Sequence, residues 1–227
     1  MSKGLRRDGP KTGSQKRQQR DLTMSETGES EQKRRVRALY GESSIAVYQA
    51  YPKEIAERAV RAGTFVAPFK EDRMTWIKPS FLWMMYRSGW ATKPNQECVL
   101  SIEITREGFE WALAHSSLSH FDRHVHPDPA AWRKGLNESP VRVQWDPDRS
   151  TSFDPLPERA IQVGLSGEAV KRYVRDWIIG VNDVTGFVHS IRSEIRQGCT
   201  EGAMQKLPVE RHYPLPECIR NRIGADK

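Results

Sequence analysis

Apolar and polar residues alternate along two stretches of the chain, as they do on a half-buried β-strand. Residues 98–104 show the strongest alternation, and residues 43–51 show the same pattern around Ile45 and Val47. Less complete patterns predict further short strands at residues 64–67, 73–78, 141–145 and 159–163. These segments supply the strands of the predicted sheet.

Between the predicted strands, apolar residues recur at helical spacing. After Pro52, for example, Ile55, Ala59 and Ala62 lie on one helical face before Gly63 ends the pattern. Helices are predicted for residues 52–62, 81–88, 106–115, 166–178 and 182–196. Residues 119–132 and 146–149 are polar and contain prolines, which predicts loops. The part after residue 198 is predicted to be an extended arm with a last short turn.

The predicted strands and helices do not alternate regularly, which favours an α+β fold over a doubly wound α/β fold. We therefore expect a single compact domain over residues 34–227, with a mixed or antiparallel sheet flanked by helices. Residues 1–33 contain scarcely an aliphatic side chain and cannot bury enough apolar surface to offset the entropy of ordering. This basic segment is predicted to be a disordered tail.

The positive charge of the chain is concentrated in that tail. The formal net charge is +7, yet residues 1–35 contain ten Lys or Arg and five Asp or Glu residues. The remainder has 26 basic and 24 acidic residues, so the domain itself is nearly balanced. Composition therefore gives no support for nucleic-acid binding by the domain.

Cys98, Cys199 and Cys218 are odd in number and lack metal-ligand spacing, which favours free thiols in a reducing compartment. No apolar run reaches the roughly 18 residues of a membrane-spanning helix. These features predict a soluble, intracellular and cytoplasmic protein with no membrane partner. A nuclear location is the alternative, because Lys33-Arg34-Arg35 is a basic cluster.

The most distinctive stretch is residues 73–90, which combines three tryptophans with several cations. Ser80 follows Pro79 and is a natural N-cap for a helix that ends at Gly89. One interpretation is a core helix, because aromatic and methionine residues at helical spacing are usually buried. The other is a ligand site, in which flanking polar residues converge on an anion near the helix N-terminus. Its candidate residues are Lys78, Ser80, Arg87 and Ser88.

The run Arg-Met-Thr-Trp-Ile-Lys-Pro-Ser-Phe-Leu-Trp-Met-Met-Tyr-Arg-Ser-Gly-Trp at residues 73–90 resembles the signature of an uncharacterised family, domain of unknown function 4291. The resemblance covers most of the chain after Arg35. This family implies no established activity.

Over a shorter part, the sequence also resembles the first strands and helices of ADP-ribosyltransferase-like domains. There a strand ending in a tyrosine and polar motif, here Tyr48, Gln49 and Tyr51, is followed by a helix, a glycine and a second strand-helix pair. The likeness implies a transferase acting on a nucleotide or dinucleotide, with NAD as the ligand. Gln49 stands where those enzymes usually have His or Arg, and no residue can be assigned to their late glutamate.

Our first functional hypothesis is therefore a transferase-type enzyme with a nucleotide-like ligand in a pocket lined by Lys, Arg and Trp. Tyr48 or Gln49 would contact a sugar. The residues that would bind phosphate or complete the pocket are Arg73, Thr75, Lys78, Ser80, Arg87 and Ser88. The alternative is a non-catalytic module that binds nucleic acid or protein through its aromatic residues.

A third hypothesis is a metal-dependent enzyme. His120, Asp122, His124 and His126 alternate along one segment, with Asp128 close behind, and imidazoles suit zinc or iron. The opposing interpretation is an ordinary polar surface loop. P-loop, Rossmann, hydrolase-elbow and zincin motifs are all missing from the sequence, so those enzyme classes have no support.

Overall fold

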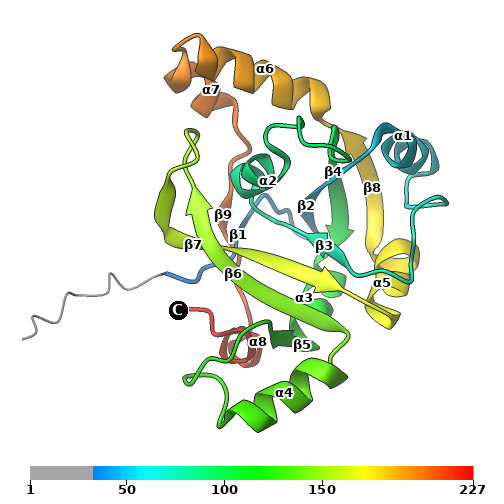
Figure 1. The fold of residues 1–227 in the computed structure, drawn as a ribbon, viewed down its shortest axis with the longest axis vertical. Coiled ribbons are helices and arrows are strands. Elements are labelled where there is room, and N and C mark those ends of the chain that lie inside the picture. Colours follow the sequence, from blue (N-terminus) through cyan, green and yellow to red (C-terminus); the bar gives the residue numbers. More distant parts are fainter. Residues whose placement is uncertain (1–32, 227) are drawn as a thin grey trace, which may run out of the picture.

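Two β-sheets form the centre of the protein, for which a computed structural model describes residues 33–226 (Figure 1). Their strands are β2 (Ser44–Tyr51), β3 (Thr75–Ile77), β4 (Cys98–Thr105), β5 (Ser116–Leu118), β6 (Val141–Arg149), β7 (Pro155–Leu165) and β8 (Ile178–Asp183). The first sheet has the order β2-β4-β8 and is antiparallel. The second has the order β3-β7-β6-β5 and is mixed, because β5 and β6 are parallel.

Helices cover the sheets and close both ends of the molecule. They are α1 (Lys53–Ala62), α2 (Phe81–Ser88), α3 (Arg106–Ala114), α4 (Pro129–Glu138), α5 (Glu168–Arg172), α6 (Thr185–Arg196), α7 (Thr200–Lys206) and α8 (Glu217–Ile223). A π-helical turn (Tyr173–Trp177) continues α5, and β1 (Arg37–Ala38) pairs with β9 (Arg211–His212). Figure 1 shows α6 and α7 at one end and α4 and α8 at the other. None of the helices within residues 33–226 is long and apolar enough to span a membrane.

A backbone bridge joins the two sheets. The amide of Tyr48 in β2 donates to the carbonyl oxygen of Lys78, just beyond β3, at 2.8 Å. The strands therefore follow one another in the order β8-β4-β2-β3-β7-β6-β5. Lys78 lies at the junction between the sheets.

Two groups of buried apolar residues stabilise this arrangement. The larger fills the space among the sheets, α1, α3 and α8. The smaller packs α2 against β2 and α6 through residues such as Phe81, Met85 and Ile191. Trp83 is only 4% exposed, and Trp90 is buried as well. The α2 helix is thus a core helix on one side, which leaves its remaining side for the second sheet and solvent.

The expected α+β class, with mixed and antiparallel sheets flanked by helices in one compact domain, is confirmed. The predicted tail, residues 1–33, lies outside the described residues except for Lys33. The carbonyl oxygen of Lys33 accepts a hydrogen bond from the Arg159 amide at 2.9 Å. The predicted helix over residues 81–88 agrees with α2 at both ends.

Several local predictions were wrong in one respect: they underestimated regular structure. Residues 146–149 are the end of β6 rather than a loop, because they pair with β7 through a register shift after Pro147. The predicted loop 119–132 contains the start of α4, where Asp128 accepts hydrogen bonds from the amides of Ala130 and Ala131. A Pro at a first helical position explains why the proline signal was misleading there.

The structure corrects three further predictions. Residues 64–67 are irregular rather than a strand. The strand β8 was missed between two predicted helices, although its β-branched residues Ile178, Ile179 and Val181 favour a strand once β4 is available as a partner. The predicted extended arm after residue 198 contains α7 and α8.

Candidate functional site

The local sequence around α2 fixes the orientation of the side chains on both sides of the helix. The Ser80 hydroxyl accepts a hydrogen bond from the Trp83 amide at 3.3 Å. Gly89 ends the helix with φ of 61°, a conformation that glycine adopts without a steric penalty. Lys78 before the helix and Arg87 in its last turn therefore have defined positions relative to each other.

A pocket of about 380 Å³ lies between α2 and the β6-β7 hairpin. We call it the cationic pocket because three of its lining residues are Lys or Arg and one is acidic. Its lining residues are Trp76, Lys78, Trp83, Tyr86, Arg87, Gln144, Asp146, Pro147, Arg149 and Gln162. The sheet junction at Lys78 thus brings β3, α2, β6 and β7 to a single site.

Lys78 is the most unusual titratable group in this pocket. It is only 7% exposed, and its Nζ donates to the carbonyl oxygen of Trp76 at 3.1 Å. Burial and, to a smaller extent, the charge of Arg87 lower the pKa of Lys78 to about 7, while Asp146 acts in the opposite direction. The amine therefore changes protonation state near neutral pH.

The other charges in the pocket are held differently. The Asp146 carboxylate accepts hydrogen bonds from Gln144 Nε2 at 2.9 Å and from Gln162 Nε2 at 2.6 Å. Arg87 is exposed, and its guanidinium has neither a hydrogen bond nor an ion pair within residues 33–226. The Asp146 carboxylate is thus already hydrogen-bonded, whereas the Arg87 guanidinium is available to a ligand.

Arg149, the third cation of the pocket, lies close to aromatic rings in its lining. Its guanidinium carbon lies 4.1 Å from the centre of the Tyr86 ring and 5.9 Å from that of Trp83. Its Nη1 donates to the carbonyl oxygen of Phe153 at 3.1 Å. Arg149 Nε and Trp83 Nε1 are buried and have no hydrogen-bond partner in the described part of the chain. Buried donors without acceptors are costly, and such sites suit a ligand that supplies acceptors.

The structure does not bring Tyr48, Gln49 and Thr75 into this pocket. Gln49 Nε2 donates to Thr75 Oγ1 at 2.6 Å and to Tyr51 Oη at 2.9 Å, and Gln49 Oε1 accepts from Tyr173 Oη at 2.7 Å. The amide of Gln49 is therefore engaged inside the protein. Tyr48 packs against Phe81 and has a raised pKa because it is buried.

The remaining predicted residues have separate positions. Ser80 caps α2 and also donates to Asp148 Oδ1 at 3.3 Å. Ser88 is fully buried and donates to the Met84 carbonyl oxygen at 3.0 Å. Arg73 lines a different pocket, of about 250 Å³, together with Thr75. Of the predicted ligand residues, only Lys78 and Arg87 meet in the cationic pocket.

A pair of acidic residues that the sequence did not single out meets at the N-terminus of α2. Glu210 Oε1 accepts a hydrogen bond from the Phe81 amide at 2.6 Å. Burial and, to a smaller extent, the nearby carboxylate of Asp148 raise the pKa of Glu210 to about 8, against the effect of the hydrogen bond from the Phe81 amide. Burial also raises the pKa of Asp148. No local pattern links the two residues, because β6 and the segment before β9 approach only in the folded chain.

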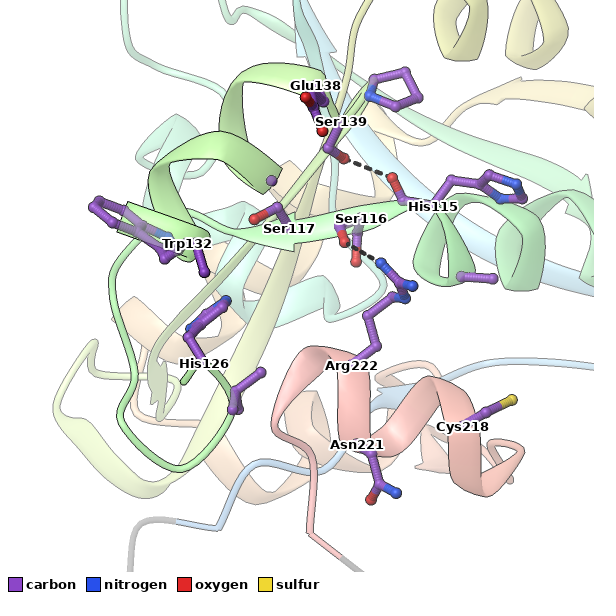
Figure 2. A pocket seen from close by; sticks show the side chains of 15 residues that line it. His115, Ser116, Ser117, His126, Trp132, Glu138, Ser139, Cys218, Asn221 and Arg222 are labelled. Carbon is purple, nitrogen blue, oxygen red and sulfur yellow. Dashed lines mark hydrogen bonds between the residues drawn. The ribbon is translucent and has the colours of Figure 1, made fainter. Parts of the chain in front are cut away.

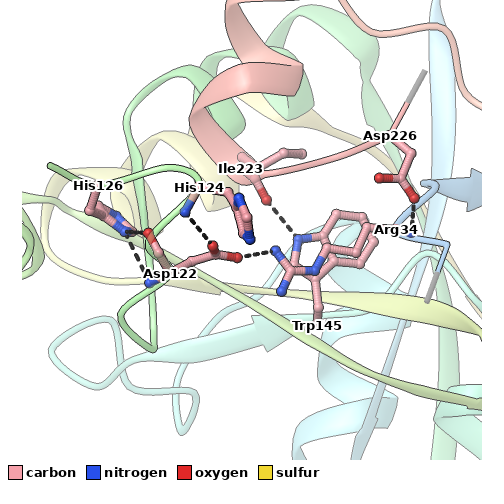
Figure 3. Close-up of polar contacts among 7 residues, drawn as sticks. All are labelled: Arg34, Asp122, His124, His126, Trp145, Ile223 and Asp226. Atoms are coloured by element: carbon pink, nitrogen blue, oxygen red, sulfur yellow. Dashed lines mark hydrogen bonds and ion pairs between the residues drawn. The ribbon is translucent and has the colours of Figure 1, made fainter. Parts of the chain in front are cut away.

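The histidine-rich segment is held by contacts of its own, which Figure 3 shows. Asp122 Oδ2 forms an ion pair with Arg34 Nη1 at 2.6 Å, and Asp122 Oδ1 accepts from the His124 amide at 2.9 Å. His126 Nδ1 lies 3.1 Å from the carbonyl oxygen of Asp122. Across residues 33–226, no three His, Cys, Asp or Glu side chains come together in a way that would hold a metal ion. The arrangement gives the metal hypothesis no support.

A second cavity, of about 690 Å³, lies between α4, β5 and α8 (Figure 2). His126, Trp132 and Arg222 are among its lining residues. Arg222 is exposed and donates from Nη1 to the carbonyl oxygen of Ser116 at 3.3 Å. The cationic pocket is the better candidate for a functional site, because it contains a buried lysine whose pKa is lowered to about 7.

Comparison with known proteins places the chain in one family. None of the curated proteins matches it. The sequence model of the domain of unknown function DUF4291 matches residues 35–213, a span that includes every residue lining the cationic pocket. Arg222 of the second cavity lies beyond the matched span. The chain therefore belongs to the DUF4291 family.

Proposed function

We propose that the cationic pocket binds a phosphate-bearing, nucleotide-like ligand and that the domain acts on this ligand as a transferase. The observation that carries the proposal is the meeting of Lys78, Arg87 and Arg149 around a single carboxylate, Asp146, that already has two hydrogen-bond donors. An anion would gain charge-assisted hydrogen bonds from these cations. Arg guanidinium groups are well suited to phosphate because they present two parallel donors.

The walls of the pocket support a ligand that also carries a flat ring. Trp76, Trp83 and Tyr86 line it, and Arg149 already lies against two of these rings. A volume of about 380 Å³ is near the lower end of the range for small-molecule sites, which is about 300–1,000 Å³. A mononucleotide, or one half of a dinucleotide such as NAD, is therefore the expected size of ligand.

The transferase part of the proposal is supported by the likeness in element order to ADP-ribosyltransferase-like domains. The strand β2 is followed by α1, Gly63 and a second strand-helix pair, β3 and α2. Binding of nucleic acid or protein through stacked aromatics is the alternative function. It is less well supported, since Trp90 is buried in the core and Trp83, only 4% exposed, borders the cationic pocket rather than the open surface.

Calorimetric titration of the full chain tests the binding step. The ligands are AMP, ADP and NAD, each compared with adenosine, which has the same ring and sugar but no phosphate. We expect a phosphate-bearing ligand to bind and adenosine to bind much more weakly. Arg87→Gln should lose about 1.5–3 kcal/mol of binding free energy. Arg133→Gln is the matched control, because Arg133 is an exposed residue of α4 outside the pocket.

Two results would contradict the binding proposal. One is the same affinity for adenosine as for the phosphorylated ligands. The other is failure of every phosphorylated ligand to bind a folded chain at millimolar concentration. The transferase step is tested separately, by incubating the chain with NAD and following release of nicotinamide, with the Arg87→Gln variant as the comparison.

A further inference from the structure

The amine of Lys78 combines burial with access to a ligand. Lys78 is only 7% exposed, yet it lines the cationic pocket. The one hydrogen bond of its side chain within residues 33–226 is donated by Nζ to the Trp76 carbonyl oxygen. A neutral amine has two hydrogens, so this bond leaves the nitrogen lone pair free.

The surroundings of Lys78 are those that activate a lysine as a nucleophile. Lysine amines become nucleophilic at neutral pH when they are desolvated or lie beside another cation. Lys78 satisfies both conditions, because it is buried and Arg87 lines the same pocket. The charged groups that face Lys78 are Arg87 from α2, and Asp146 and Arg149 from β6. Burial is the largest cause that lowers the pKa of Lys78, Arg87 lowers it as well and Asp146 opposes them, which leaves the pKa at about 7.

We propose that Lys78 Nζ forms an imine with the carbonyl carbon of a phosphate-bearing aldehyde or ketone bound in the cationic pocket. The nitrogen lone pair attacks the carbonyl carbon, and a carbon-nitrogen bond replaces one carbon-oxygen bond. The two hydrogens of the amine leave with the carbonyl oxygen as water when the second carbon-oxygen bond breaks and the second carbon-nitrogen bond forms. No electrons are gained or lost, so the step needs no oxidant or reductant.

This inference rests on the proposed function, in that Arg87 and Arg149 hold the phosphate. Arginine guanidinium groups are in effect permanently charged in proteins. They can therefore bind the anion while the amine of Lys78 is neutral. The inference narrows the ligand class to compounds that carry a carbonyl group as well as a phosphate, such as phosphorylated sugars in their open-chain form.

Reductive labelling of the full chain tests the inference. Pyridoxal 5′-phosphate is the probe, and pyridoxal, which lacks the phosphate, is the control compound. Cyanoborohydride reduces the imine and so makes the label permanent. Peptide mass mapping then identifies the labelled lysine. We expect Lys78 to be labelled first and to favour the phosphorylated aldehyde by about tenfold or more. The labelling rate should rise with pH, with a midpoint above about 7, because the bound phosphate raises the pKa of Lys78 from its value of about 7 in the empty pocket. Lys134, an exposed residue of α4, should be labelled slowly and without that preference.

Variants make the test specific. Arg87→Gln should reduce the preference of Lys78 for the phosphorylated aldehyde. Lys78→Arg should abolish the rapid, phosphate-dependent labelling. The melting temperature of Lys78→Arg shows whether the variant is folded. Labelling of Lys78 no faster than of Lys134 would overturn the inference. If AMP, ADP or NAD binds but Lys78 is not selectively labelled, the imine fails and the binding proposal stands. If Lys78 is selectively labelled but no nucleotide binds, the imine stands and the nucleotide ligand fails.

Discussion

Glu210 Oε1 accepts a hydrogen bond from the backbone amide of Phe81 at 2.6 Å, so the segment before β9 is tied to the first residue of α2. The bond forms in a buried site that also contains Asp148. A helix N-terminus favours a negative charge, but burial and a second carboxylate disfavour it. The second effect is larger, because the pKa of Glu210 is raised to about 8.

Glu210→Gln should therefore stabilise the protein at high pH. A raised pKa in the folded state means that stability from Glu210 is complete below about pH 4.5 and is lost as pH rises through about 8. Glutamine keeps an oxygen for the Phe81 amide and cannot ionise. The melting temperature of the variant should exceed that of the parent at pH 8.5 and approach it at pH 4.5.

The control for this prediction is Glu201→Gln, since Glu201 is exposed on α7. It should follow the parent at every pH. Equal melting temperatures of Glu210→Gln and the parent at pH 8.5 would show that the carboxyl group of Glu210 is solvated.

Lys78→Met should also raise the melting temperature, but over a different pH range. The pKa of Lys78 is lowered from 10.5 to about 7, so the unfolded chain binds more protons between these values and stability rises with pH across this window. The penalty is largest at and below pH 7. We expect the variant to melt on the order of 5 °C higher at pH 7 and to lose the advantage by about pH 10.5.

The exposed residue Lys134 provides the comparison for Lys78, and Lys134→Met should leave the melting curve unchanged at every pH. A fall in melting temperature for Lys78→Met at pH 7 would mean that the ammonium group is stabilised by its surroundings. In that case Lys78 is a structural residue rather than part of a binding site.

Binding of a phosphorylated ligand should take up a proton near neutral pH. A bound anion raises the pKa of Lys78, so binding favours the ammonium form. Above pH 7 the free protein must take up a proton at Lys78 in order to bind. Its affinity for the ligand should therefore fall by up to about tenfold per pH unit. Titration calorimetry at pH 6.5, 7.5 and 8.5 measures this dependence. Lys78→Met should bind more weakly and with almost no pH dependence, and a parent curve as flat as that of the variant would contradict the linkage.

Two substitutions at Trp83 separate its packing from its hydrogen-bonding group. Trp83→Ala should lower the free energy of unfolding by roughly 3–5 kcal/mol, because the side chain is nearly fully buried. Trp83→Phe keeps much of the ring and removes Nε1, which has no hydrogen-bond partner among the described residues. It should therefore cost much less stability than Trp83→Ala but weaken ligand binding. Chemical denaturation and calorimetry measure the two effects, and parental stability of Trp83→Ala would show that the ring does not support the core.

Local signals in the sequence were sufficient for one side of the cationic pocket. Ser80 and Gly89 are cap residues whose chemistry does not depend on distant partners, and they fixed both ends of α2. Lys78 and Arg87 were found because they flank this helix. The opposite side could not be found in the same way, because Asp146 belongs to a strand only through its pairing with β7. Pro147 in that segment gave a misleading turn signal.

Gln49 illustrates why a polar residue at a strand end is a weak guide to a site. From the sequence its amide was as suitable for a sugar as for the protein itself. In the folded chain, Thr75 and Tyr173 approach from β3 and the π-helical turn and take up both ends of the amide. These partners lie 26 and 124 residues away along the chain, so no local pattern indicates them.

The hydrogen bond from the Tyr48 amide to the Lys78 carbonyl oxygen links ligand binding to the movement of the two sheets relative to each other. A ligand that contacts the Lys78 side chain also restrains the main chain at the point where the two sheets meet. Relative movement of the sheets must break this bond, and breaking it exposes the Tyr48 amide to exchange with solvent deuterium. Occupancy of the cationic pocket should therefore slow exchange at Tyr48, a residue that the ligand itself does not touch.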